Sequence, residues 1–214
     1  KAVVAYLREL AKERDRGEPE RRRYEAKLLV LGDGAEGKTC VSRALRGKKF
    51  REQETTLGVD VRPWTFPHPD EPDDEAKRIT LNIWDFEGQE INHQSHQFFL
   101  TSRSLYLLVF NARKGFRSDR LEYWLDTIRA RAPGARVVLV ASECENRTPG
   151  VPVGRLRQSY PDLLQADDCF FAVGCATNKN IDALADHLQR LAADMELMGT
   201  PWPPWTSTPS ARRS

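Results

Sequence analysis

The sequence predicts an α/β fold with a doubly wound, mostly parallel, six-stranded sheet and flanking helices. Short apolar segments of strand length alternate along the chain with helical segments, which is the pattern of βαβ crossovers. Most of the strand segments are almost continuously apolar, as expected where helices cover both faces of a parallel sheet. The 214 residues, 40% of them hydrophobic, are enough for one domain with a substantial core.

The chain divides into three parts. Residues 1–24 contain an apolar stripe at helical spacing over 2–14, followed by a charged linker. Residues 25–197 carry the alternating pattern. Residues 198–214 lack periodicity and are rich in Pro, Ser and Thr, so we expect a disordered tail. The first residue is Lys, which indicates a piece of a longer protein.

The strands are expected in a fixed order. The segment 59–66 alternates apolar and polar residues and contains Pro63, so it is predicted to be an antiparallel edge strand. The acidic segment 67–77 then forms the turn of a hairpin. The continuously apolar strands are predicted at residues 28–32, 79–85, 105–110, 137–142 and 170–174.

Helices fill the intervals between these strands. We expect them at residues 38–46, 118–131, 153–160 and 181–197. Asn180 is a suitable N-cap for the last helix, and Asp182 lies favourably in its first turn.

Composition excludes several functional classes. Lys and Arg total 33 against 31 Asp and Glu, a net charge of +2, so no nucleic-acid partner is expected. No apolar run approaches the ~18 residues of a transmembrane helix, and there is no signal peptide, so no membrane partner is expected. The four cysteines form no CxxC pair, which argues against zinc or disulfides and for a cytoplasmic location.

A phosphate-binding motif follows the first apolar strand. Residues Gly32, Gly37, Lys38 and Thr39 match GxxxxGK[ST] between a strand and a helix. In such a loop, backbone N–H groups surround a phosphate, the lysine adds a positive charge, and the threonine hydroxyl can bind Mg²⁺. Glu36 is unfavourable beside a triphosphate unless its side chain points away.

Two further segments carry groups suited to the same site. Asp85 ends a buried strand, where a carboxylate can bind Mg²⁺, and Gly88 and Gln89 follow it. Gly88 can contact a γ-phosphate, and Gln89 can orient a water molecule. Before that strand, Thr56, with Thr55 as the alternative, can bring a hydroxyl to the metal.

These motifs resemble a Ras-like GTPase of the P-loop NTPase class, and specifically the Roc domain of the Roco family. The stretch WDFEGQEINHQSHQFFLTSRSLYLLVFNARKG carries the closest likeness, and the resemblance covers about residues 26–197. The first helix is similar to the segment that joins a leucine-rich-repeat array to Roc, and MGTPWPPW to the segment leading into COR. The resemblance therefore implies leucine-rich-repeat and COR neighbours, and a homodimer formed through COR.

The resemblance also implies GTP or GDP with Mg²⁺ as ligands, and a role for each matching residue. Gln89, Lys38 and Thr56 are the implied catalytic residues, and Thr39, Thr56 and Asp85 the metal ligands. Gly34 leaves room for the attacking water, while His93 and His96 are expected to be structural. The residues implied to bind nucleotide are Gly32, Asp33, Gly34, Ala35, Glu36, Gly37, Lys38, Thr39, Cys40, Gly88, Glu145 and Cys175.

The base-reading motifs depart from the family pattern. Ser142, Glu143, Cys144 and Glu145 stand where the family has Asn-Lys-x-Asp. Glu145 can still accept hydrogen bonds from the guanine N1 and N2 groups, but its extra methylene is expected to misplace a bidentate pair. In the last loop, Gly174-Cys175-Ala176 replaces Ser-Ala-Lys. The Cys175 N–H can still meet the guanine O6, but both lysine stems are absent. We expect weakened guanine binding, because each lost contact costs ~1–3 kcal/mol.

Three hypotheses follow. The leading one is a guanine-nucleotide switch domain of a larger Roco signalling protein, with slow GTP hydrolysis that depends on Mg²⁺ and on help from a partner or dimer, because no arginine finger is recognised. The second is a degenerate Roc module that acts as a scaffold with weak or no nucleotide binding. The third, a P-loop ATPase, has less support because no motif reads adenine.

Overall fold

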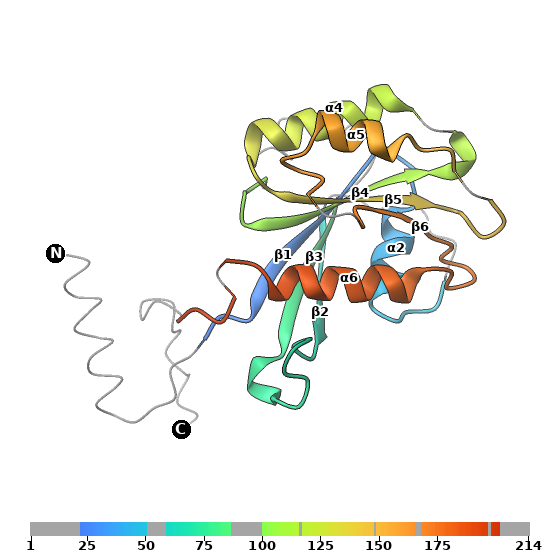
Figure 1. Cartoon of the computed structure of the whole chain (residues 1–214). Helices are drawn as coiled ribbons and strands as arrows, with labels where there is room; N and C mark the ends of the chain where they lie inside the picture. The colour runs from blue at the N-terminus through green and yellow to red at the C-terminus, as the bar shows by residue number, and fades with distance from the viewer. Residues whose placement is uncertain are drawn as a thin grey trace, which may run out of the picture.

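The chain forms three layers, a central sheet between two layers of helices (Figure 1). Helices α4 and α5 cover one face of the sheet, and helices α2 and α6 cover the other. The computed structural model describes residues 22–50, 59–86, 100–115, 117–147, 149–165, 168–196 and 198–201. The predicted N-terminal helix and most of the predicted tail lie outside these residues.

The sheet has six strands in the order β2-β3-β1-β4-β5-β6, and every neighbouring pair is parallel except β2 with β3. This confirms the predicted fold class and the antiparallel edge strand. Strand β6 ends two residues earlier than predicted, because Gly174 turns to pair with Lys179. The strands are β1 (Glu25–Leu31), β2 (Val59–Phe66), β3 (Ile79–Phe86), β4 (Ser104–Asn111), β5 (Arg136–Ser142) and β6 (Phe170–Ala172).

The predicted helices are present, with two corrections. Helix α6 ends at Ala193 rather than 197, where a tight turn takes the chain back toward β1. Asn180 precedes α6 but does not cap it: its backbone is left-handed, and its side-chain amide donates to the Ala172 carbonyl. The helices are α2 (Lys38–Leu45), α4 (Ser118–Arg131), α5 (Val153–Ser159) and α6 (Ile181–Ala193), with single 3₁₀ turns η1 (Glu75–Lys77) and η2 (Ala112–Lys114).

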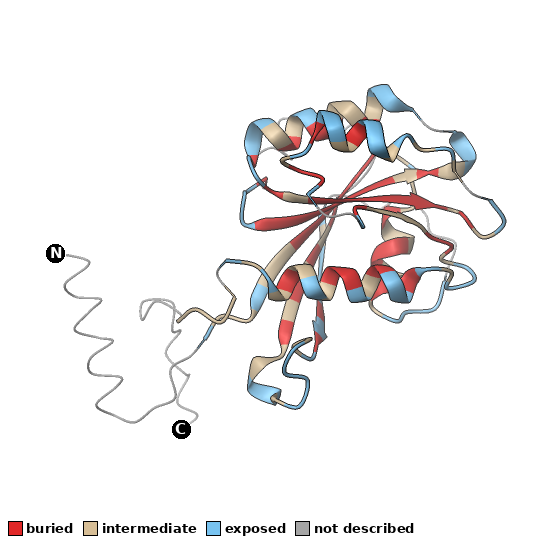
Figure 2. Ribbon diagram, in the orientation of Figure 1, coloured by how far each residue is buried: buried red, intermediate tan, exposed pale blue. Residues whose placement is uncertain are grey.

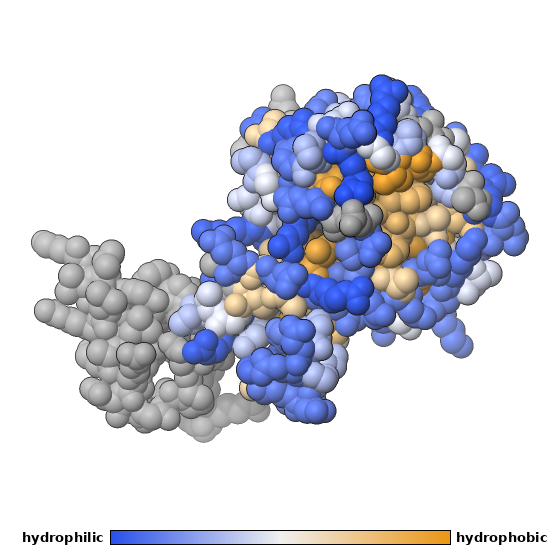
Figure 3. Space-filling view, viewed as in Figure 1, coloured by the Kyte–Doolittle hydropathy of each residue, from blue (hydrophilic) through white to orange (hydrophobic). Residues whose placement is uncertain are grey.

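Two apolar cores lie on the two faces of the sheet (Figure 2). Successive strand residues point to opposite faces, so Leu28 and Val30 of β1 pack against α2 and α6, while Leu29 and Leu31 pack against α4 and α5. Most of the visible surface is hydrophilic, and apolar side chains gather in a hollow between α5 and α6 at the β6 end of the sheet (Figure 3). No helix within the described residues is long and apolar enough to cross a bilayer.

The predicted hairpin is formed by β2 and β3, which project beyond the other strands (Figure 1). Its acidic turn is largely exposed, and Lys77 pairs there with Glu71 and Asp74. The alternating pattern of β2 buries Trp64 and Phe66. The hairpin therefore anchors β3, the strand that carries Asp85 near its end, on the side of the sheet away from β4.

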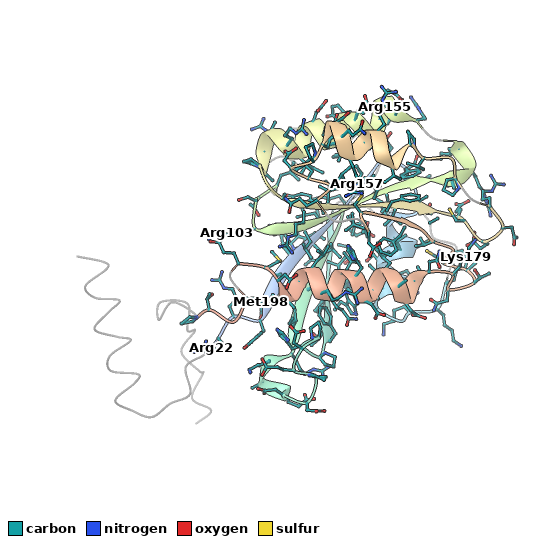
Figure 4. All side chains as sticks on the ribbon, viewed as in Figure 1. Arg22, Arg103, Arg155, Arg157, Lys179 and Met198 are labelled. Atoms are coloured by element: carbon teal, nitrogen blue, oxygen red, sulfur yellow. The ribbon has the colours of Figure 1, made fainter. Side chains whose placement is uncertain are left out.

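The first and last described segments lie side by side (Figure 4). The Arg23 N–H donates to the Thr200 carbonyl at 2.7 Å, and the Gly199 N–H donates to the Arg23 carbonyl at 2.8 Å. Arg22 adds a side-chain bond to the Gly199 carbonyl. Residues 198–201, which the sequence assigns to the tail, therefore pair with the segment leading into β1.

Candidate functional site

The predicted phosphate loop joins the end of β1 to the start of α2, and two of its positions require glycine. Gly32 has φ +141°, and a Cβ there would lie 2.2 Å from the Val109 carbonyl oxygen. Gly37 has φ +85°, and its Cβ would lie 2.9 Å from Ser142 Oγ. The chain therefore bends tightly against β4 and β5. No side chain caps the start of α2, and the N–H groups in the first turn of a helix point toward an anion bound at its N-terminus.

Lys38 is buried in this loop. Its Nζ donates to the Gly32 carbonyl at 3.0 Å and to the Asp33 carbonyl at 2.7 Å. Burial lowers the pKa of Lys38, and the nearby charge of Asp85 is the largest opposing influence. An ammonium group has three donors, so one N–H remains for a phosphate oxygen.

Glu36 points away from the inside of the loop. Its carboxylate accepts from the backbone N–H of Asn111 and pairs with Lys114 at 3.0 Å. Lys114 also donates to the Gly34 carbonyl. The repulsion that the sequence left open is thereby avoided, because the negative charge is neutralised on the outer side of the loop.

Asp33 is also turned outward, toward α4. Arg120 binds it through two hydrogen bonds of 2.6 Å, and the Trp124 indole adds a third at 3.2 Å. Burial alone would raise the pKa of Asp33, but Arg120 and Trp124 outweigh it and lower the pKa. Asp33 therefore fixes the loop to α4, and in this conformation its side chain does not face a nucleotide.

Asp85 supplies the observation that best fits a metal. It is 2% exposed, and neither carboxylate oxygen accepts a hydrogen bond of ordinary geometry from the described residues, although the Thr39 hydroxyl lies near enough to act on it. Burial raises its pKa, whereas Thr39 and Lys38 act to lower it. Two orphaned oxygens beside a threonine hydroxyl form a donor set suited to Mg²⁺, so Thr39 and Asp85 fit the predicted ion.

The first base loop follows β5 and is tied to the phosphate loop. Ser142 Oγ donates to the Glu36 carbonyl at 2.8 Å. Glu143 has φ +56° and turns away from this contact, with its carboxylate bonded to Asn111 and Arg113. Glu143 is therefore not placed to cover a base. This agrees with the expectation that the chain lacks the contact made by the lysine that the family has at this position.

The second base loop follows β6 and receives the Glu145 side chain. Glu145 Oε1 accepts from the Ala176 N–H at 3.3 Å. Lys179 lies in the same loop before α6 (Figure 4) and donates to the Cys144 carbonyl at 2.6 Å. Burial is the main reason that the pKa of the Cys175 thiol is raised to about 12, and Cys40 is among the groups that act on it. The two base loops and the start of α2 are thus brought together.

Some residues of the site were not predicted from the sequence, and some predicted residues lie outside the described part of the chain. Asn111 and Lys114 could have been found, because they follow the strand next to β1 and so flank its loop. Nothing in the sequence marked Arg120 or Lys179 as a partner of these loops. The predicted residues outside the described part are Thr55, Thr56, Gly88, Gln89, His93 and His96.

Comparison with known proteins places this arrangement in a family. Residues 27–145 match the family model described as "Ras of Complex, Roc, domain of DAPkinase", a span from β1 to Glu145 that includes the phosphate loop. The chain belongs to the Roc family. This confirms the resemblance and the Ras-like fold of the Roc domain.

Relatives of this Roc domain are large proteins. It is 30% identical, over 95% of its length, to the probable serine/threonine-protein kinase pats1 of Dictyostelium discoideum. It is 28% identical, over 67% of its length, to leucine-rich repeat serine/threonine-protein kinase 1 of Caenorhabditis elegans. The chain spans only 7% and 6% of these two proteins.

A solved structure shares the fold at a higher identity. The Methanosarcina barkeri Roco2 RocCORdC structure bound to GDP superimposes with a TM-score of 0.72 at 33% identity, covering 87% of this chain and 54% of that chain. That structure holds GDP and extends beyond its Roc domain, as its description states.

Proposed function

We propose that this Roc domain binds GTP and GDP with Mg²⁺ and hydrolyses GTP slowly, as the switch of a larger Roco protein. The unpartnered buried carboxylate of Asp85 beside Thr39 and Lys38 carries the proposal. A buried charge of this kind is costly without a partner, and a magnesium nucleotide is the partner that the adjoining loop fits. The relative bound to GDP supports the choice of nucleotide.

The residues of the chain would act by positioning and by charge. The backbone N–H groups at the start of α2 and the remaining donor of Lys38 would hold the phosphates, while Thr39, Thr56 and Asp85 would hold the metal. Bound Mg²⁺ would offset negative charge on the phosphate oxygens. Gly88 contacts the γ-phosphate, and Gln89 orients a water molecule that attacks its phosphorus, so that the bond to the β-phosphate oxygen breaks and GDP leaves.

Slow turnover follows from the arginines beside the loop. Arg120 is bonded to Asp33, and Arg113 to Glu143, so neither is available to stabilise charge on the γ-phosphate. A missing transition-state cation costs ~10³–10⁵ in rate. We therefore propose that a partner or a second subunit, brought together through an adjoining COR domain, supplies the missing charge in the cytoplasm.

Binding of a fluorescent GDP analogue tests the proposal. We expect Lys38→Ala to abolish binding, while the control Lys48→Ala, at an exposed lysine after α2, binds normally. Gln89→Ala should bind GDP normally and slow single-turnover GTP hydrolysis. Normal nucleotide binding by Lys38→Ala would refute the site assignment.

The second candidate, a scaffold that binds no nucleotide, is favoured by the base loops alone, because Glu143 is turned away and no lysine stem covers the base. The same protein distinguishes the two. A ligand at 100 times its Kd stabilises the folded state by about 2.7 kcal/mol, so GTP with Mg²⁺ should raise the melting temperature by about 5–10 °C. No shift at millimolar nucleotide would support the scaffold.

A further inference from the structure

The Glu145 side chain lies directly over Gly174. A Cβ built on Gly174 would come within 3.0 Å of Glu145 Cγ and 3.1 Å of Cδ. Thr177 Oγ1 would lie at 3.1 Å from the same Cβ. These contacts are tighter than ordinary van der Waals packing, so a side chain at position 174 would require Glu145 to shift by a few tenths of an ångström. The position of the Glu145 carboxylate therefore depends on the absence of a side chain at position 174.

The backbones of the two base loops are fixed against each other. The Cys144 N–H donates to the Val173 carbonyl at 2.9 Å, and Lys179 Nζ donates to the Cys144 carbonyl at 2.6 Å. Gly174 and Lys179 exchange two backbone hydrogen bonds of 3.0 and 2.9 Å. Because these bonds fix the distance between the two base loops, the backbone cannot move to make room for the methylene by which glutamate exceeds aspartate. The room has to come from a smaller side chain beside Glu145.

The carboxylate keeps unused acceptor capacity. Among the described residues, its Oε1 accepts the Ala176 N–H at 3.3 Å, and its Oε2 accepts no hydrogen bond. Each carboxylate oxygen can accept two hydrogen bonds. Guanine presents two adjacent donors, N1–H and the 2-amino group, whereas adenine presents an acceptor at N1. An acceptor-only group here therefore selects guanine.

We propose that Glu145 and Gly174 form one specificity-determining pair, in which the absent side chain at 174 makes room for the longer acid and so restores guanine recognition. The inference rests on the proposed function, because it requires a nucleotide at the phosphate loop. It revises the expectation that the extra methylene misplaces the carboxylate. In the sequence, the pair is visible because Glu145 replaces the Asp of the family pattern and Gly174 replaces its Ser.

A double-mutant cycle tests the pair, with GDP and ADP affinities measured by displacement of a fluorescent nucleotide. We expect Glu145→Asp to weaken GDP about tenfold, because the shorter acid is drawn back from the base. Gly174→Ser should do the same by displacing Glu145. The double variant should recover to within about threefold of the wild type, a coupling of about thirtyfold or more. A double variant weakened by the product of the single effects would overturn the pairing.

Controls separate this inference from folding and from the proposed function. Gly174→Ala, with a smaller side chain, should lower GDP affinity while circular dichroism stays unchanged, and Glu143→Asp should leave the GDP-to-ADP affinity ratio unchanged. Competition by magnesium pyrophosphate, which has no base, should be equal in all variants. If the wild type binds neither GDP nor pyrophosphate, the proposed function fails; if it binds both and the variants show no coupling, only the pairing fails.

Glu145→Gln provides a chemical check. Its amide can donate to the C2 carbonyl of xanthine, so XDP affinity should rise about tenfold while GDP affinity falls. Unchanged affinities for both nucleotides would show that Glu145 does not reach the base.

Discussion

Single residues at the centre of the site are held in costly arrangements. Asp85 is buried, and its carboxylate oxygens accept no hydrogen bond of ordinary geometry from the described residues. Gly32 approaches the β4 backbone so closely that a Cβ would lie 2.2 Å from the Val109 carbonyl oxygen. Costly arrangements of this kind are typical of functional sites. At Asp85, a bound metal would supply the partner that the carboxylate lacks.

Asp85→Asn should make the nucleotide-free protein more stable at pH 7, by about 1–3 kcal/mol, because it removes a buried carboxylate that lacks hydrogen bonds. The folded-state pKa of Asp85 is raised above its ordinary value of 3.8. Its charge therefore destabilises the fold, by an amount that is absent below pH 3.8 and grows as the pH rises toward the folded-state pKa. Urea unfolding at pH 3 and pH 7 measures this difference. The same variant should lose the magnesium-dependent part of GTP binding, and a less stable variant at pH 7 would contradict the assignment.

Gly32→Ala should destabilise the protein by at least about 3 kcal/mol, because the new Cβ would meet the Val109 carbonyl oxygen at 2.2 Å. Gly134→Ala is the matched control. Gly134 also has a positive φ, of +73°, but its Cβ would contact nothing within 4 Å, so only about 1 kcal/mol is expected. Equal losses in urea titrations would show that the backbone conformation, and not the close approach, requires glycine at position 32.

At the scale of elements, the segment from β4 to α4 clamps the phosphate loop from outside. Lys114 holds Glu36 and the Gly34 carbonyl, and Arg120 holds Asp33. The carboxylates of Asp33 and Glu36 are therefore neutralised on the outer side of the phosphate loop, away from where a phosphate would bind. The potential inside the loop thereby stays favourable for a polyphosphate, although two of the eight loop residues are acidic.

Arg120→Ala should cost about 1 kcal/mol of stability at pH 7, because the pair is charge-assisted but partly exposed. The pKa of Asp33 is lowered in the folded state. The contribution of the pair is therefore fully present above pH 3.8 and is lost as the pH falls through the lowered value. Urea unfolding at pH 7 and pH 2 should show the difference disappearing in acid. Arg117→Ala, at the residue before the same helix and in an exposed pair with Asp119, should cost almost nothing at either pH.

At the scale of the whole molecule, the described chain begins and ends at one place, opposite the phosphate loop. Residues 22–23 pair with 199–200, and Tyr24 accepts from the Thr80 N–H of β3. Segments attached on either side would therefore leave the domain together, beside the start of β3. Movement of a neighbouring domain would act on this shared attachment.

A fragment of residues 25–197 should melt about 5–10 °C below a fragment of residues 22–201. It lacks four hydrogen bonds that join the chain ends to each other and to β3, worth about 2–4 kcal/mol together. Differential scanning calorimetry of the two fragments measures the effect. Equal melting temperatures would show that the paired ends add nothing to the fold.

The sequence by itself determined the sheet, its antiparallel edge strand and the loop that follows β1. Local properties of the chain decide its secondary structure and the backbone of its phosphate loop. Here those properties are the apolar periodicity, Pro63 and the GxxxxGK[ST] spacing. Only the tertiary structure decided where the charged side chains of that loop point. Glu36, Asp33 and Glu145 take their positions from Lys114, Arg120 and Gly174, which are 29 or more residues away in sequence. Electrostatic pairing and steric room act through space, so they appear only when the strands bring these residues together.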